Sequence, residues 1–520
     1  MRILLAMAMA VALGQTTGMA AVLCVDDDNQ TGVEDGSPLR PFSTVQAAIQ
    51  AAADSDEIRV AAGTYAENVV VDTLAVTLIG GFSGGAPAGY AGNQPGDFSI
   101  RDPTVHVTTL QGDGTVAVLR FLRFGSVAGW TTVDGFRITG GTRGVHLDGE
   151  YPSGEFERFL IKSNVIEGNG GHDPWFAHRG GGIALEGSEI HVVGNLIRDN
   201  TADTGAGVGG AGHALLVQDN TIRDNVGYGD HGGGLWLGGD GTVAGNRILD
   251  NRIGELAGYG WGGGLLVVVG QWTLSGNLVA GNTAPSLGGG VFVDEGAEAW
   301  LDHELYVGNH TLTEWAGGGA GLYVDGAWDG ARSSASLRNC TIAANTSPGT
   351  VGGNGIFVEL SDVVVVDSVV WGNSGGDDFH VEPNGALNVT YTLSEEPWPG
   401  VGNLSLDPLF ADPANGDFHL RSSGGRWDDV VGAWVHDPQD SPAVDAGDPA
   451  SAFHLEPRPN GGRVNLGAYG NTPWASRTPG QGLLFADGFE SGHTAAWSAT
   501  VPAAPTTLRR AARRRAATGG

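Results

Sequence analysis

Between Asn164 and Asn373 the chain repeats one pattern of apolar and polar positions. Each copy opens on glycines, continues with alternating apolar residues, and then places an Asn, an apolar pair and a second Asn before a loop, as in GGGIALEGSEIHVVGNLIRDN and GGGLWLGGDGTVAGNRILDN. Alternation such as Ile190 and Val192 is typical of strands and not of helices. Because a repeat of this length indicates a solenoid, we predict that each copy is one coil of a β-solenoid.

The first Asn of each copy is predicted to form a ladder along the stack. Equivalent side chains of successive coils lie about 4.8 Å apart. An inward-facing amide both donates and accepts hydrogen bonds, and Asn tolerates the left-handed backbone of a sharp turn. After a skip at Asp302, the predicted members of this ladder are Asn164, Asn195, Asn220, Asn246, Asn277 and Asn339.

The segments on either side of the repeat are predicted to close its ends. Residues 22–130 should form the N-terminal cap and first coils, with a helix that begins at a capping box over Ser43–Gln46, ends near Ala53 and covers the first coil. Strands are predicted over 57–61, 69–71 and 76–79. The repeat body is predicted over 131–400, and a C-terminal cap over 401–476 should seal the far end.

The two chain ends have compositions unlike the body. Residues 1–21 combine one Arg, an apolar run and small residues, which predicts a signal peptide and a secreted or cell-surface protein. Residues 477–520 are predicted to be a flexible tail that carries an acidic-aromatic motif and an Arg-rich end. No transmembrane segment is expected.

The charge balance limits the partners. The chain has 58 acidic against 27 basic residues and a net charge of −31, and five of the arginines lie in 509–515. So acidic a body is not expected to bind nucleic acid or an anionic membrane. Neutral glycans, cations and basic partners fit better, and we expect a monomer. Calcium is a candidate ion, although acidity is also typical of soluble exported proteins. Cys24 and Cys340 are predicted to be separate thiols.

Two further segments resemble a known family. VDDDNQTGVEDGSPLRPFSTVQAAIQAAADSDEIRVAAGTYAENVVV is similar to the opening of bacterial proteins of the pectate-lyase-like superfamily, and DPLFADPANGDFHLRSSGGRWDDVVGAWVHDPQDSPAVDAGDP resembles a closing segment of its exported members. With the repeats, the resemblance covers most of residues 24–476. It implies an all-β, right-handed parallel β-helix with a short N-terminal capping helix and an irregular C-terminal cap. It implies little about activity, because the superfamily contains lyases, hydrolases, esterases, epimerases and non-catalytic surface proteins.

Loops that follow the second Asn should line one edge of the solenoid, and aromatic residues gather in them. Such side chains stack on sugar faces, so they predict carbohydrate binding along this edge. The alternative is that they fold back over the ends of the coils. The aromatic candidates are Trp175, Tyr228, Tyr259, Trp261 and Trp315.

The same loops contain the candidates for a hydrolase. Asp203, Asp230 and Glu255 lie in three consecutive loops. Equivalent carboxylates are separated by about 5 Å in adjacent coils and about 10 Å in alternate coils, which brackets the separations of retaining and inverting glycosidases. Three acids among 58 also meet this condition easily by chance.

A calcium-dependent polysaccharide lyase is the other enzymatic alternative. The resemblance implies a basic residue near acidic calcium ligands, and the nearest counterparts are Lys162, the only lysine, or Arg179 with Asp173. A lone lysine on a coil is more often solvated. Asp26–Asp28 and Asp377–Asp378 are candidate calcium clusters. Two hypotheses therefore remain: a surface protein that binds carbohydrate or another partner, and a polysaccharide-active enzyme, lyase before hydrolase.

Overall fold

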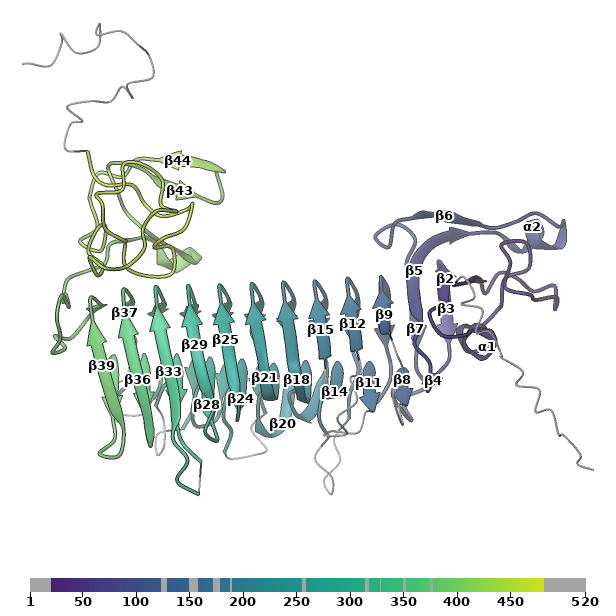
Figure 1. The fold of residues 1–520 in the computed structure, drawn as a ribbon, viewed down its shortest axis with the longest axis horizontal. Helices are drawn as coiled ribbons and strands as arrows, with labels where there is room; N and C mark the ends of the chain where they lie inside the picture. The colour runs from purple at the N-terminus through teal and green to yellow at the C-terminus, as the bar shows by residue number, and fades with distance from the viewer. Residues whose placement is uncertain are drawn as a thin grey trace, which may run out of the picture.

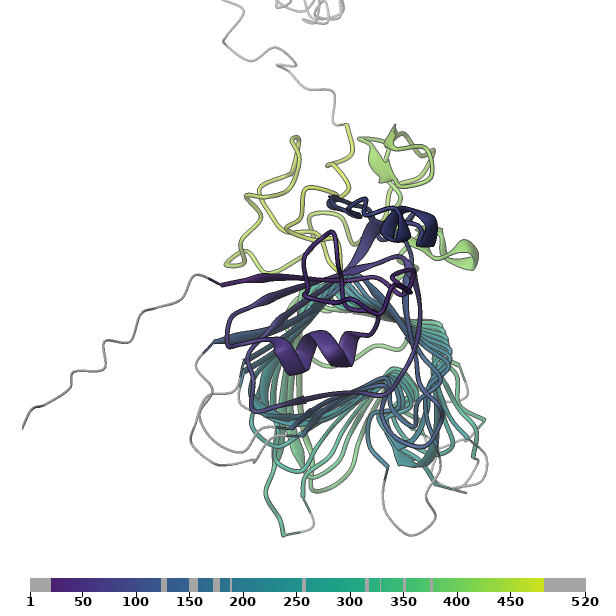
Figure 2. The same ribbon diagram turned by 90° about the vertical axis from the view of Figure 1, so that its right-hand side faces the viewer.

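The computed structural model describes residues 20–122, 129–148, 158–171, 178–187, 189–254, 259–313, 318–327, 329–348, 352–374 and 377–480. These residues form a long stack of β-coils with a small helix at one end and an irregular segment beside the other (Figures 1 and 2). Strands of successive coils pair in parallel and in register, so the alternating apolar residues of every coil meet inside the stack. The predicted all-β parallel β-helix is therefore confirmed.

Each coil contributes strands to three parallel sheets, which we number I to III. Sheet I contains β1 (Val22–Val25), β2 (Glu57–Ala61), β5 (Thr77–Gly84), β9 (Trp130–Asp134), β12 (Arg158–Lys162), β15 (Glu189–Val193), β18 (Val208–Gln218), β21 (Leu235–Ala244), β25 (Gln271–Ser275), β29 (Glu298–Asp302), β33 (Ser333–Arg338), β36 (Ser361–Val366) and β39 (Ala386–Thr390). Sheet II contains the first halves of β18 and β21 together with β4 (Val69–Asp72), β8 (Leu119–Leu122), β11 (Val145–Asp148), β14 (Ile183–Gly187), β24 (Leu265–Val268), β28 (Val291–Asp294), β32 (Leu322–Val324), β35 (Ile356–Val358) and β38 (Phe379–Val381).

Sheet III closes the coil between two Asn corners. It contains β3 (Gly63–Ala66), β7 (Thr108–Gln111), β10 (Phe136–Thr139), β13 (Val165–Glu167), β16 (Leu196–Arg198), β19 (Thr221–Arg223), β22 (Arg247–Leu249), β26 (Leu278–Ala280), β30 (Leu305–Val307), β34 (Thr341–Ala343), β37 (Val369–Trp371) and β40 (Leu393–Ser394). A short fourth sheet between sheets III and II contains β17 (Thr201–Thr204), β20 (Val226–His231), β23 (Arg252–Ile253), β27 (Thr283–Ala284) and β31 (His310–Thr311).

Two rows of asparagines run along the corners of sheet III. In the first row, Asn220 Oδ1 accepts hydrogen bonds from Asn195 N and Nδ2 at 2.9 and 3.0 Å, and Asn220 Nδ2 donates to Val192 O at 2.7 Å. The same contacts link the members from Asn164 to Asn277. The second row contains Asn169, Asn200, Asn225, Asn251, Asn282, Asn309, Asn345 and Asn373. Each amide thus satisfies corner backbone groups and the next coil.

The structure corrects the first row at Asn339. After Asn277 the row continues through Glu304, whose Oε1 accepts from Asn277 Nδ2 at 2.9 Å, and then through Cys340. Asn339 lies one residue earlier, at a left-handed corner position with φ of 47°, and its Nδ2 donates to Asn465 O at 3.0 Å. In the other coils, too, the residue before the ladder Asn takes the left-handed backbone, as Asp219 does with φ of 55°.

The N-terminal end is closed as predicted, with a shift in the start of its helix. Helix α1 (Val45–Ala51) buries Val45 and Ile49 against the first coils. Its N-cap is Thr44 and not Ser43, because Thr44 Oγ1 accepts from Ala47 N at 3.2 Å. Strands β2, β4 and β5 confirm the three predicted strands. A second helix, α2 (Pro87–Ala91), and β6 (Asp97–Arg101), which is antiparallel to β5, lie beside this end.

Residues 406–480 pack beside the last coils and not across their end, which differs from the expected cap (Figure 1). Two hairpins, β41 (Phe410–Asp412) with β42 (Asp417–Leu420) and β43 (Arg426–Asp428) with β44 (Ala433–Val435), and the turn η2 (Pro413–Asn415) form this segment. Its apolar residues cover outward side chains of sheet III, including Val307, Ala343 and Val369. The end of the stack is instead covered by Trp398, whose ring lies 5.1 Å from that of Phe379.

Both cysteines are buried free thiols, in agreement with the sequence, and burial raises the pKa of Cys24 to about 11. Of the helices that the structure describes, none has the length and hydropathy of a membrane-spanning segment.

Candidate functional site

An aromatic row covers the outer face of sheet II in the later coils. Register places Phe292, Tyr323 and Phe357 at equivalent outward positions of β28, β32 and β35. Their rings stack, with centroids 5.0 and 4.6 Å apart, and His380 of β38 continues the stack at 4.5 Å from Phe357. Phe292 and Tyr323 are each only 2% exposed. The row therefore forms a small apolar core outside the coils.

A row of carboxyl groups runs parallel to these rings, two residues further along each strand. Asp294, Asp325, Glu359 and Glu382 follow the paired residues of β28, β32, β35 and β38, so they occupy equivalent positions in successive coils. Burial, with a contribution from the charge of Asp325, raises the pKa of Asp294 to about 7. Burial and the charge of Glu359 raise the pKa of Asp325 to about 6. Asp294 and Asp325 therefore release their protons at higher pH than an ordinary aspartate does, and Asp294 does so close to neutral pH.

A cavity of about 280 Å³ lies where the two rows meet. Four of its lining residues, Asp325, Gly326, Ala327 and Gly330, come from the corner between β32 and β33. Tyr323 fixes one carboxylate, because its hydroxyl donates to Glu359 Oε2 at 2.7 Å. The lining residues are Trp261, Leu287, Phe292, Asp294, Asp325, Gly326, Ala327, Gly330, Glu359, Leu360 and Asn384. Stacking surfaces and hydrogen-bonding oxygens thus face the same space.

Of the five predicted aromatic candidates, the structure places Trp261 in this cavity. Its ring stacks on Phe292 at 6.3 Å and meets His231 edge-on at 4.8 Å. Tyr259 is 70% exposed on the surface, and Tyr228 is half-buried in β20. Trp175 and Trp315 lie outside the described residues.

The structure does not bring Lys162 and Arg179 together. Lys162 ends β12 in sheet I, where its Nζ lies 3.3 Å from the Asp134 carboxylate. The Arg179 guanidinium lies 4.3 Å from the ring centroid of Trp236 on the outer face of sheet II. Asp173 lies outside the described residues. Of Lys162 and Arg179, Arg179 is therefore the one that reaches the sheet II face.

The predicted hydrolase carboxylates have unlike surroundings. Asp203 is buried, and its Oδ2 accepts from His178 N at 2.7 Å. Asp230 is exposed and bonds to His231 Nδ1 at 2.7 Å, and this hydrogen bond lowers the pKa of Asp230. Glu255 lies outside the described residues. Neither Asp203 nor Asp230 lines the cavity described above.

In each candidate calcium cluster, one carboxylate already accepts hydrogen bonds from other groups of the protein. Asp26 Oδ2 accepts from the Tyr90 hydroxyl at 2.6 Å and from Gly85 N at 2.8 Å. Asp378 accepts from Asn373 Nδ2 and Glu395 N, both at 2.8 Å, and so terminates the second Asn row. Across the part of the chain that the structure describes, no three or more His, Cys, Asp or Glu side chains are grouped to hold a metal ion.

Comparison with known families agrees with this architecture. A family model described as "right handed beta helix region" matches residues 125–312. The chain is a right-handed parallel β-helix protein. A second model, described as "disaggregatase related", matches residues 329–447 of this β-helix protein, which are its last coils and most of the segment packed beside them.

Two further comparisons concern individual proteins. No curated protein matches the sequence of this β-helix protein significantly. Among solved structures, the crystal structure of pectate lyase Pel9A matches with a TM-score of 0.36 and 12% identity, over 87% of this chain and 96% of that chain.

The carboxyl row of this β-helix protein was not predicted from the sequence, although four coils contain a sequence signal for it. The segments VFVD, LYVD, IFVE and FHVE each pair an outward ring with an acid two residues later. Strand alternation places both side chains on the same face of a sheet. The repeated ring-and-acid pattern therefore marks the two rows once the coils are aligned.

Proposed function

We propose that this β-helix protein binds a polysaccharide in the cavity on the outer face of sheet II. The observation that carries the proposal is the meeting of the two rows. Trp261, whose ring stacks on the buried Phe292, offers an apolar wall for a sugar ring, and Asp294, Asp325 and Glu359 offer oxygens for its hydroxyl groups. The rows follow the axis of the stack, as an extended glycan laid along it would. A location outside the cell, predicted from residues 1–21, fits such a ligand.

The charge of the cavity favours neutral or amino-bearing sugars over uronates. Among the described residues that line the cavity, three carry carboxyl groups and none is Arg or Lys. A uronate polymer would bring further negative charge to this row and so would be disfavoured. A lyase also needs a cation or metal to neutralise the uronate carboxylate. The binding of a neutral or cationic glycan is therefore the function that the geometry supports best.

The raised pKa values favour a second candidate, glycoside hydrolysis by the same row. Asp294, with a pKa of about 7, holds a proton near neutral pH and would protonate the leaving glycosidic oxygen. Asp325, one coil away and with a pKa of about 6, ionises first and would act as nucleophile or base. A separation of about 5 Å between adjacent coils suits a retaining mechanism. Overall, water adds across the bond: the leaving sugar receives hydrogen and the anomeric carbon receives hydroxyl.

A glycan panel with matched variants tests the proposal. Purified protein is titrated with a neutral β-glucan, chitosan oligomers and polygalacturonate, and both affinity and new reducing ends are recorded. Trp261→Ala is expected to weaken binding of the neutral or amino glycan about five- to tenfold, because a stacking surface is lost. The control is Trp300→Ala, since Trp300 is 47% exposed on sheet I, away from the cavity.

Each outcome has a distinct meaning. Equal losses in the two tryptophan variants, or binding of polygalacturonate alone, would contradict the proposed site. New reducing ends that disappear in Asp294→Asn while affinity is kept would establish hydrolysis. Ultraviolet absorbance from unsaturated products would establish a lyase instead. Binding without any product would leave the binding function and remove both enzymatic alternatives.

A further inference from the structure

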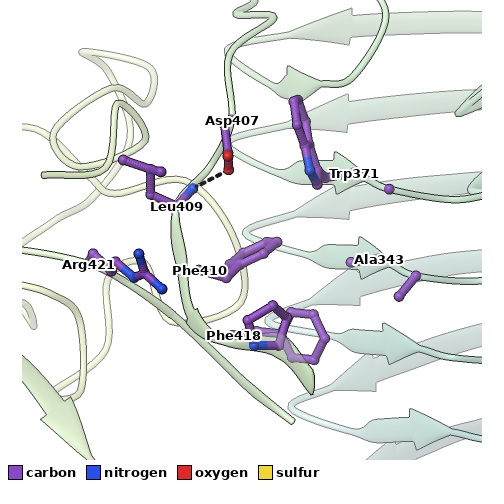
Figure 3. Close-up of a pocket in the computed structure, with 10 residues that line it drawn as sticks. Ala343, Trp371, Asp407, Leu409, Phe410, Phe418 and Arg421 are labelled. Atoms are coloured by element: carbon purple, nitrogen blue, oxygen red, sulfur yellow. Dashed lines mark hydrogen bonds between the residues drawn. The ribbon is translucent and has the colours of Figure 1, made fainter. Parts of the chain in front are cut away.

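A second cavity, of about 350 Å³, lies between sheet III and the C-terminal segment (Figure 3). Coil residues Ala343 and Trp371 form one side, and the β41–β42 hairpin forms the other. Small-molecule sites are often found at the interface between two structural units of a protein. The volume of this cavity lies in the range that is usual for such sites. The cavity shares no residue with the one on sheet II.

The walls of this second cavity are apolar and preformed. Phe410 and Phe418 meet edge-to-face, with ring centroids 5.1 Å apart and planes at 74°. Both rings are buried in the cluster that joins the hairpin to sheet III. Trp371 is half-buried on the coil side, and Figure 3 shows its ring across from Phe410. A flat or branched apolar body would therefore meet rings without rearrangement of the backbone.

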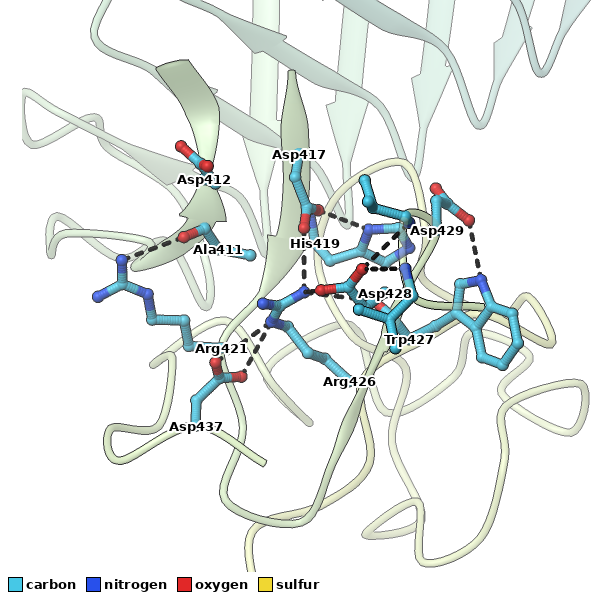
Figure 4. Close-up of polar contacts among 12 residues, drawn as sticks. Ala411, Asp412, Asp417, His419, Arg421, Arg426, Trp427, Asp428, Asp429 and Asp437 are labelled. Atoms are coloured by element: carbon cyan, nitrogen blue, oxygen red, sulfur yellow. Dashed lines mark hydrogen bonds and ion pairs between the residues drawn. The ribbon is translucent and has the colours of Figure 1, made fainter. Parts of the chain in front are cut away.

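Arg421 is the cation that lines this cavity, and it has no carboxylate partner in the part of the chain that the structure describes. Arg421 Nη2 donates to Ala411 O at 3.1 Å, and within the described residues the guanidinium forms no ion pair. Arg426, five residues later, is bound by Asp417 at 3.0 Å, by Asp428 at 3.4 Å and by Asp437 at 3.1 Å (Figure 4). In a chain with 58 acidic residues, an arginine beside an apolar cavity has thus kept its planar donors available for an anion.

One negative charge also lines the cavity. Asp407 is exposed, and its Oδ1 accepts from Leu409 N at 2.8 Å (Figure 3). A second anionic group on a ligand would be repelled by this carboxylate. The cavity therefore discriminates between one and two negative charges.

We propose that this cavity binds a small amphipathic monocarboxylate. The apolar body lies against Trp371, Phe410 and Phe418, and the single carboxylate pairs with the Arg421 guanidinium. A free apolar acid and the C-terminal residue of a peptide both present this chemistry.

Titration of the full-length chain by calorimetry tests the proposal, with 3-phenylpropionate as the probe. Saturable binding is expected, and Arg421→Gln is expected to weaken it at least about tenfold, because a charge-assisted pair is lost. Arg247→Gln is the matched control, since Arg247 is an exposed arginine of sheet III outside the cavity. Benzylmalonate, which carries two carboxylates on the same ring, is expected to bind more weakly than 3-phenylpropionate and to gain affinity in Asp407→Asn.

Two further comparisons complete the test. N-acetyl-L-phenylalanine represents the C-terminal residue of a peptide, 3-phenylpropionate represents a free apolar acid, and the amide of N-acetyl-L-phenylalanine is the control without a carboxylate. Tighter binding of N-acetyl-L-phenylalanine than of 3-phenylpropionate indicates a peptide C-terminus. Trp371→Ala changes a wall without changing charge, and it is expected to lose binding even if Arg421→Gln melts early. No saturable binding of any monocarboxylate, or unchanged affinity in both Arg421→Gln and Trp371→Ala, would overturn the proposal.

Discussion

Glu304 introduces an ionisable group into a row that otherwise begins with five amides. Its Oε1 accepts from Asn277 N at 3.0 Å and from Asn277 Nδ2 at 2.9 Å, as an Asn oxygen does in the preceding coils. Its Oε2 is buried and interacts with the buried Tyr306 hydroxyl, and neither atom has another hydrogen-bond partner among the described residues. Burial raises the pKa of Glu304 to about 8. At neutral pH the side chain is therefore mostly protonated and stands in for an amide.

Replacing Glu304 with Gln is expected to remove a pH-dependent part of stability. The folded pKa of about 8 lies above the unfolded value of about 4.3, so the folded state holds the proton more tightly. Stability is thus present at low pH and is lost as pH rises between these two values. At pH 9 Glu304→Gln is expected to be more stable by roughly 1–3 kcal/mol. Thermal melts at pH 5 and pH 9 measure the difference.

The control for this change is Glu298→Gln, because Glu298 is exposed on sheet I. Its melts should follow those of the unmodified protein at both pH values. If Glu304→Gln also follows them, ionisation of this buried carboxyl has no part in the pH response.

Replacing Asn220 measures how much one ladder amide contributes to the free energy of unfolding. Leu has a similar volume but neither donates nor accepts, so Asn220→Leu leaves Asn195 N and Val192 O without their partner. A loss of roughly 1–3 kcal/mol in the free energy of unfolding is expected. Urea denaturation measures this loss. Thr221→Val, at the outward position next to Asn220, is the control, and equal unfolding curves for the two variants would contradict the ladder account.

At the scale of elements, strand alternation and the capping pattern were sufficient to predict the coils and the helix that covers them. The sheet II rows were not predicted, because rings at outward positions look like ordinary core residues in a strand. Asp294 and Asp325 meet only when two coils are aligned, and coil length varies along the chain. Trp261 was selected from its loop, but its neighbours in the cavity come from strands and corners of later coils.

The position of the C-terminal segment could not be predicted from the sequence for a similar reason. One outward position of sheet III is charged in early coils, as at Arg198 and Arg223, and becomes apolar at the equivalent residues of later coils, as at Val307 and Ala343. This change creates the surface on which residues 406–480 pack. It becomes visible in the sequence only after the outward position of each short strand is known.

Phe418→Ala is expected to loosen that packing. A buried Phe-to-Ala change costs about 3–5 kcal/mol, and Phe418 joins β42 to the sheet III surface. Limited proteolysis followed by mass spectrometry should show faster cleavage within 406–476, while the coils resist. Val430→Ala is the control, because Val430 is 98% exposed at the tip of the β43–β44 hairpin. Equal cleavage in both variants would show that this contact does not hold the segment in place.

At the scale of the whole molecule, the two cavities differ in the charge of the side chains that line them, and so in the ligands that they favour. Among the described lining residues, the sheet II cavity has three carboxyl groups, and the second cavity, between sheet III and the C-terminal segment, has Arg421 with a single carboxylate. A net charge of −31 would by itself suggest that the protein avoids all anions. The proposed carboxylate site would reverse that expectation at one place, because the acids around Arg426 pair with that arginine, while Arg421 forms no ion pair among the described residues.

The two Asn rows also influence which insertions and deletions the protein can accept during evolution. Consecutive members of the first row are 31, 25, 26 and 31 residues apart, yet every step makes the same amide contacts. The corners thus hold the coils in step, while the loop edge that follows the second Asn row, between sheets III and II, tolerates added or deleted residues. An insertion at that edge alters the surface of one coil and spares its neighbours. New recognition loops can therefore be acquired singly, without a redesign of the scaffold that carries them.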